Sequence, residues 1–205
     1  MKIHTFVLAT TLAAGAFASP LNEADRERVL SELQTSGTIF LDSIANLSPA
    51  QWTYKAGPDR WSIAEVSEHI VAAESYIGGG VTNHLMRTPA DPARAAERQP
   101  TNAKADEMVL VNMRDRTHKA TAPGEITPKG IYKVPADAAE AFKAAREKNL
   151  GYARTTSDAL RDHFVELQPG RTLDGVQGLL MLAGHTERHV AQIEEVKQSP
   201  AYPKH

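Results

Sequence analysis

Residues 179–193 read LLMLAGHTERHVAQI. The run is apolar enough to form a buried helix, yet it carries His185 and His189 four residues apart. On an α-helix this spacing places both imidazoles on one face, with their Cβ atoms about 5–6 Å apart. Burying two polar rings is costly unless something engages both of them. The pair therefore indicates a metal chelate that needs a third ligand from elsewhere in the chain.

The composition narrows the classes of protein to consider. With 205 residues, 41% of them hydrophobic and 23% charged, the chain is predicted to form one globular domain. A formal net charge of −2 without blocks of like charge argues against nucleic acid as a partner. The sequence has no cysteine, which excludes disulfides, cysteine zinc sites and thiol nucleophiles. Any chemistry is left to histidine, carboxylates, hydroxyls or a metal.

The N-terminus has the pattern of a secretory signal peptide, predicted over residues 1–18. Lys2 is followed by an apolar stretch over residues 6–14, and then by a small-x-small cleavage site at residues 16–18. The apolar stretch is too short to remain as a stable membrane anchor. We predict a periplasmic or secreted protein, with residues 19–205 as its single domain.

Apolar residues recur at helical spacing in four segments of the mature chain. The first is predicted over residues 23–46 and the second begins after Ser62, where Ser62 and Glu65 have the spacing of a capping box. The third and fourth are predicted over residues 136–163 and 173–197. With almost no strand signal, this pattern predicts an all-α four-helix bundle.

The second and third helices are joined by a long segment, residues 88–134, that is rich in proline. Only residues 103–114 within it have a helical pattern. A connection of this length is typical of a crossover or of a lid over a site, and a plain surface excursion is the alternative. We therefore expect a long crossover between helices two and three.

A third histidine lies on an apolar helix face. The predicted second helix carries His69 on the same stripe as Val66, Ile70 and Ala73. The other histidines lie in the signal peptide, at the C-terminus or in polar surroundings: His4, His205, His84, His118 and His163. His69 is therefore the candidate to complete the chelate.

Three neutral imidazoles suit a divalent metal, with Zn²⁺ favoured and Ni²⁺, Fe²⁺ or Mn²⁺ as alternatives. We predict a metal site formed by His69, His185 and His189. Three protein ligands with a fourth position open are typical of catalytic zinc sites. The alternative is that His69 only bonds to the backbone and that the spacing of the other two is coincidental.

Two familiar metal motifs do not fit the residues. A zincin needs glutamate directly after the first histidine, but Thr186 holds that place and Glu187 points away from the ligand face. A ferritin-like di-iron site needs paired Glu-x-x-His motifs, which neither histidine-bearing helix provides. Glu65 and Tyr76 lie near His69 and are candidate general bases, although helix capping and packing explain them equally well. The catalytic residues stay unassigned.

Two motifs resemble a known family in combination. The segments WSIAEVSEH, residues 61–69, and HTERHVAQI, residues 185–193, resemble the DinB-like (YfiT-like) metalloenzymes, and residues 115–123 contribute to the resemblance. The resemblance implies a four-helix bundle that binds a divalent metal through one histidine of the second helix and two of the fourth. These positions match His69, His185 and His189. Arg188 and Gln192 also match the pattern, which implies packing or outer-shell roles for them.

Family members of known activity include thiol-dependent transferases and isomerases. Together with the predicted export, the resemblance implies an exported metal-dependent hydrolase or thiol-dependent transferase with an unknown small-molecule substrate. The alternative is a non-catalytic metal-binding or partner-binding protein of the cell envelope. An open coordination position facing a cavity favours catalysis, whereas a fourth protein ligand favours a structural metal. Dimerisation through an exposed apolar helix face is a further possibility.

Overall fold

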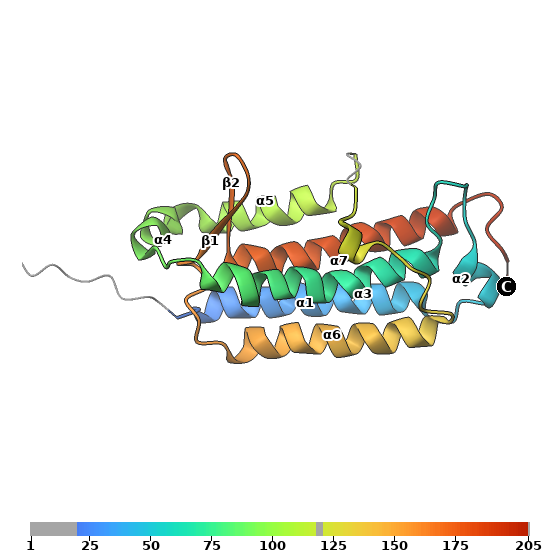
Figure 1. The fold of residues 1–205 in the computed structure, drawn as a ribbon, viewed down its shortest axis with the longest axis horizontal. Helices are drawn as coiled ribbons and strands as arrows, with labels where there is room; N and C mark the ends of the chain where they lie inside the picture. The colour runs from blue at the N-terminus through green and yellow to red at the C-terminus, as the bar shows by residue number, and fades with distance from the viewer. Residues whose placement is uncertain (1–19, 118–120, 205) are drawn as a thin grey trace, which may run out of the picture.

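The computed structural model describes residues 20–117 and 121–204, and four long helices dominate it. They are α1 (Glu23–Ile44), α3 (Ile63–Gly79), α6 (Pro135–Thr155) and α7 (Gly175–Lys197). Helix α1 contacts α6 and α7, and α3 contacts the same two helices, so the four close into a bundle (Figure 1). The predicted all-α four-helix bundle is confirmed.

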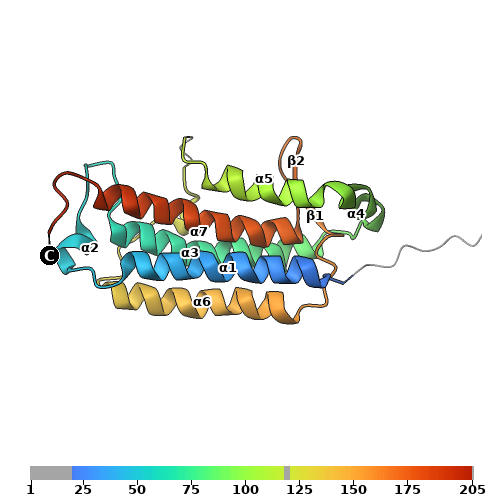
Figure 2. The same cartoon turned by 180° about the vertical axis from the view of Figure 1, so that it is seen from behind.

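The directions of the helices explain the long crossover. Figures 1 and 2 show that α1 and α7 run one way and that α3 and α6 run the other. Because α6 is parallel to α3, the chain must return to the end of the bundle where α3 began. The return path contains α4 (Pro92–Arg98), α5 (Asn102–Arg114) and a 3₁₀ turn at Gly124–Ile126. Helix α5 packs along α7 as a fifth helix beside the bundle. Its presence confirms the helix predicted over residues 103–114.

The helix starts follow from local capping. Asn22 accepts a hydrogen bond from the Asp25 amide at the start of α1. Ser62 with Glu65, and Asp174 with Gln177, form capping boxes at the starts of α3 and α7. A short helix, α2 (Pro49–Thr53), also begins with a capping box. These signals lie within a few residues of one another in sequence.

The predicted third helix is too long at its C-terminus. Helix α6 ends at Thr155, and a two-stranded antiparallel sheet follows, formed by β1 (Phe164–Gln168) and β2 (Arg171–Asp174). The Arg26 side chain on α1 donates hydrogen bonds to the carbonyls of Ala153 and Thr156, which the ending helix leaves unpaired. A contact from α1 thus stabilises the C-terminal end of α6, which the spacing of apolar residues along α6 does not indicate.

The core consists of two apolar clusters, one toward each end of the bundle. Between them lies a polar layer centred on Arg146 of α6, which is 4% exposed. Its guanidinium forms a two-bond ion pair with Glu74 of α3 and donates to Ser36 of α1 and Thr186 of α7. One side chain therefore connects all four helices. Across the described residues, we find no helix that combines the length and apolar content needed to cross a bilayer.

Candidate metal centre

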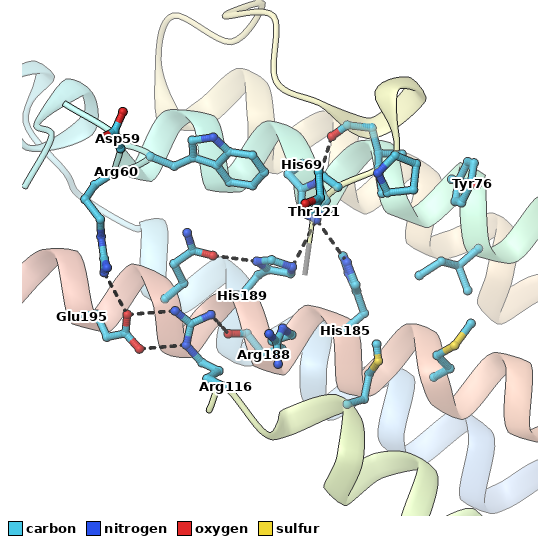
Figure 3. Close-up of a pocket in the computed structure, with 18 residues that line it drawn as sticks. Asp59, Arg60, His69, Tyr76, Arg116, Thr121, His185, Arg188, His189 and Glu195 are labelled. Carbon is cyan, nitrogen blue, oxygen red and sulfur yellow. Dashed lines mark hydrogen bonds and ion pairs between the residues drawn. The ribbon is translucent and has the colours of Figure 1, made fainter. Parts of the chain in front are cut away.

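The three histidines predicted from the sequence converge between α3 and α7. The Nε2 atom of His69 lies 3.2 Å from Nε2 of His185 and 3.1 Å from Nε2 of His189. One ligand atom from each residue lies within 4.8 Å of the other two. The side chains are almost inaccessible, at 3%, 8% and 9% exposure for His69, His185 and His189. Figure 3 shows the three rings pointing toward one another across the space between the helices.

The spacing of these nitrogens fits a shared divalent ion. Zinc–nitrogen bonds of about 2.0–2.1 Å in a tetrahedral arrangement imply nitrogen–nitrogen separations of roughly 3.3–3.4 Å. The observed 3.1 and 3.2 Å are close to this value. Three neutral nitrogen donors are also a suitable ligand set for zinc and for similar divalent metals.

The hydrogen bonds on the outer sides of the rings set their tautomers. Nδ1 of His69 lies 2.8 Å from the carbonyl oxygen of Ile126, and Nδ1 of His189 lies 2.9 Å from the side-chain oxygen of Gln192. Both Nδ1 atoms must carry the proton to donate to these oxygens, so both Nε2 atoms present lone pairs to each other. Two lone pairs 3.1 Å apart repel unless a cation lies between them. This arrangement is therefore one that could hold a metal ion.

His185 is supported differently. Its Nδ1 atom is buried and has no hydrogen-bond partner among the described residues. The partner of Nδ1 thus differs among the three histidines. For His69 it is a backbone carbonyl of the crossover, and for His189 it is a side chain one turn away on the same helix. For His185 there is none among the described residues. Gln192 thus contacts the outer nitrogen of His189, which fits one of the two roles, packing or outer support, that the family resemblance implied for it.

Burial makes the histidines poor bases in the absence of metal. Loss of solvation lowers the pKa of His69, and it lowers that of His185 well below its ordinary value. For His189, burial followed by the charge of His69 lowers the pKa to about 3. Neutral imidazole is the form that binds metal, so the environment favours the binding form.

These pKa shifts predict acid sensitivity of the metal-free protein. Since the folded-state pKa values lie below 6.5, the unfolded chain binds more protons as the pH falls below that value. The free energy of unfolding should therefore fall from pH 6.5 to pH 5, by up to about 1.4 kcal/mol per pH unit for each histidine. Urea unfolding of chelator-treated protein at several pH values measures this decrease in the free energy of unfolding. In the His189→Gln variant, the free energy of unfolding should fall less steeply with decreasing pH. If it falls as steeply as in wild type, the buried histidines do not cause the acid sensitivity.

The histidines lie in the wall of a cavity of about 560 Å³. Its lining combines charged and apolar residues. Figure 3 shows Asp59, Arg60, Arg116 and Glu195 toward one side of the three histidines and Tyr76 toward the other. The charged lining residues are Asp59, Arg60, Arg116, Arg188 and Glu195, and the apolar ones include Trp61, Ile77, Met113 and Met181. Glu195 accepts a two-bond ion pair from Arg116 and a single bond from Arg60.

The two candidate general bases differ in their placement. Glu65 does not line the cavity, because its carboxylate is used by the Ser62 cap and by Lys55. Tyr76 does line the cavity and is 46% exposed. Glu187 points away from the cluster and pairs with Arg114, as helix geometry predicted. Of Glu65 and Tyr76, only Tyr76 therefore lies beside the cavity.

Of the other histidines, the two that the structure describes, His84 and His163, do not join the cluster. His163 bonds to the Thr88 carbonyl and His84 is exposed. His4, His118 and His205 lie outside the described residues, as does the predicted signal peptide. Sequence reasoning missed the carbonyl of Ile126, and a backbone atom from a proline-rich crossover leaves no signal in sequence. It also missed Glu68, although a buried acid beside a candidate ligand could have been noticed as unusual.

Comparison with known proteins assigns the chain to a family. No curated protein matches it. The structure resembles that of YfiT from Bacillus subtilis, described as "a probable metal-dependent hydrolase with an unusual four-helix bundle topology", with a TM-score of 0.54 and 10% identity. The likeness covers 89% of this chain and 91% of YfiT and shows a shared fold. The sequence profile of the DinB superfamily matches residues 32–193. The chain therefore belongs to the DinB superfamily.

Proposed function

We propose that this protein is an exported hydrolase that depends on a divalent metal, with Zn²⁺ as the favoured ion, held by His69, His185 and His189. The observation that carries the proposal is the convergence of three Nε2 atoms in the wall of a cavity. No fourth protein ligand accompanies them among the described residues, since the cluster of potential ligands there contains only these three. An open position toward a cavity is the pattern of catalytic sites.

When bound, a divalent ion at this position acts as a Lewis acid and lowers the pKa of a coordinated water. The chain's own residues would complete the chemistry. Neutral imidazoles would leave the charge of the ion undiminished, and the three histidines are themselves buried. Arg188 lines the same cavity and donates to the Asp115 carbonyl, and in this proposal it would stabilise negative charge that develops on a substrate carbonyl. Met113 and Met181 would hold the apolar part of the substrate.

Export is part of the proposal and is supported by the sequence pattern of residues 1–18. The neighbour's description as a metal-dependent hydrolase supports the reaction class by analogy. A thiol-dependent transferase is the second candidate, supported by the resemblance of the two histidine motifs to that family. A non-catalytic metal-binding protein would have the same three ligands without turnover.

One experiment on untagged protein separates these alternatives. The protein is purified from the periplasmic fraction of expressing cells, where its mass should show removal of residues 1–18. Elemental analysis should find close to one divalent ion per chain, and a metal-free protein that also fails to take up added zinc would overturn the site. The loaded protein is then assayed against esters and lactams, with and without a small thiol. Turnover without thiol supports a hydrolase, turnover only with thiol indicates a transferase, and none in either assay indicates metal binding alone.

A further inference from the structure

A buried carboxylate adjacent to a metal-ligand candidate has an unusual set of partners. Glu68 precedes His69 on α3 and is 6% exposed. Its two oxygens accept hydrogen bonds from the backbone amides of Lys129, Gly130 and Ile131, at 2.6, 2.7 and 2.9 Å. Within the described residues no lysine or arginine forms a salt bridge with it, so the amides provide its compensation.

The backbone around Gly130 is shaped to receive this carboxylate. Gly130 has φ of +75°, in the left-handed region. Successive amides around such a residue point inward and form a concave anion-binding nest. Here the anion is supplied by the protein itself, from the neighbouring helix. Glu68 therefore fixes the position of the crossover segment 127–131 on α3.

The same segment supplies the outer support of His69. The Ile126 carbonyl lies three residues before the nest and accepts the hydrogen bond from Nδ1 of His69. Ile126 is itself buried, and its 3₁₀ turn packs against α3. The crossover is thus attached to two successive residues of α3, one through the Glu68 carboxylate and one through the His69 ring.

This attachment bears on metal binding because His69 depends on it more than the other ligands do. His189 receives its acceptor from Gln192 on the same helix, so helix geometry alone maintains that contact. The acceptor for His69 comes from an irregular segment 57 residues away, which stays in place only if something holds it. Outer partners of this kind fix the tautomer and the ring orientation of a ligand.

We propose that Glu68 is a positioning residue for the metal site: by holding segment 127–131, it keeps the Ile126 carbonyl against Nδ1 of His69 and directs Nε2 toward the metal. The proposal rests on the proposed three-histidine site, but not on any catalytic activity. It assigns a function to the crossover beyond linking two parallel helices. Loss of an outer partner of a metal ligand typically weakens metal binding by about 10–100-fold.

The test perturbs the nest from both sides. Glu68→Gln removes the negative charge while preserving shape, and Gly130→Ala disfavours the left-handed backbone without touching Glu68. No atom lies within 4 Å of an added Cβ at Gly130, so the substitution acts through the backbone conformation. Gly170→Ala is the matched control, because Gly170 has φ of +77°, equally open surroundings and a location in the β1–β2 turn. The hydrogen bond from Trp52 to the Tyr132 carbonyl involves neither Glu68 nor Gly130, so we expect it to keep the crossover docked in these variants.

Two readouts are independent of turnover. Zinc affinity, measured by competition with a chromophoric chelator, should fall about tenfold or more in Glu68→Gln and Gly130→Ala and stay unchanged in Gly170→Ala. In the metal-free protein, ¹⁵N shifts of the His69 ring, assigned with His69→Ala, should show the Nδ1–H tautomer in wild type and a mixture of tautomers in both nest variants. Hydrogen exchange at residues 129–131 confirms that the nest has been loosened.

The outcomes distinguish this proposal from the proposed function. Faster exchange at residues 129–131 with unchanged zinc affinity and an unchanged His69 tautomer would overturn the positioning role. An equal loss of affinity in Gly170→Ala would also overturn it, because general destabilisation would then explain the effect. If wild type binds zinc but hydrolyses nothing, the hydrolase assignment fails while the affinity and tautomer measurements still decide the role of Glu68. If wild type binds no zinc, the three-histidine site fails and the role of Glu68 in metal positioning fails with it.

Discussion

Replacing His185 with alanine is expected to abolish stoichiometric metal binding. The side chain supplies one of three convergent Nε2 atoms, and the described residues offer no fourth ligand in its place. The loss should exceed the roughly 10–100-fold that removal of an outer-shell partner costs, because a direct bond to the metal is lost. Metal content after dialysis against zinc-containing buffer, followed by calorimetric titration, measures the effect. His69→Ala should give the same result from the opposite helix.

The matched control is His163→Ala. His163 is also partly buried, and its Nδ1 bonds to the Thr88 carbonyl, so the variant loses a ring and a hydrogen bond away from the cluster. It should retain one metal per chain. Equal loss of metal in all three variants would indicate general unfolding, and full retention in His185→Ala would refute the three-histidine site.

The second large effect is expected from Arg146→Met. The change leaves the Glu74 carboxylate buried at 1% exposure without its cationic partner, and it removes contacts to α1 and α7. Breaking a buried pair from one side costs about 3–5 kcal/mol. For a chain of this size, that cost corresponds to a decrease in the melting temperature of roughly 6–20 °C. Thermal and urea unfolding of the metal-free protein measure it.

Two comparisons isolate the buried pair. Arg154→Met breaks the ion pair with Glu147, which is exposed to solvent, and should leave the melting temperature almost unchanged. The double variant Arg146→Met with Glu74→Gln should be more stable than Arg146→Met alone, because no uncompensated charge remains buried. If the double variant is the less stable of the two, the cost comes from lost packing of the arginine stem instead.

The polar layer around Arg146 also bears on the site. Thr186, which accepts from Arg146, is the neighbour of His185 on α7, and Glu74 lies on α3 with His69. The hydrogen bonds of Arg146 therefore connect α3 and α7, the two helices that carry the three histidines. The apolar clusters on either side provide most of the burial, but they tolerate sliding of one helix along another more easily than a fixed set of hydrogen bonds does.

Local patterns in the sequence were sufficient to predict the bundle and the residues that meet at the site. The starts of α1, α3 and α7 depend on caps formed between residues three apart, and the alignment of His185 with His189 depends on the helical repeat alone. His69 was identified because it lies on an apolar stripe. In each case the determining interaction connects neighbours in the chain.

Features that depend on distant contacts were not predictable in this way. The end of α6 depends on Arg26, more than 120 residues away, and the helix stops at Thr155 although it was predicted to continue to residue 163. The β1–β2 hairpin that follows was not predicted. The distances between His69 and the α7 histidines depend on how α3 packs against α7. The acceptor for His69 depends on a crossover held by Glu68. The sequence by itself thus determined which side chains face the core, because helical periodicity is local. Only the tertiary structure decided which of them meet and what supports them, because those contacts join segments that the chain keeps far apart.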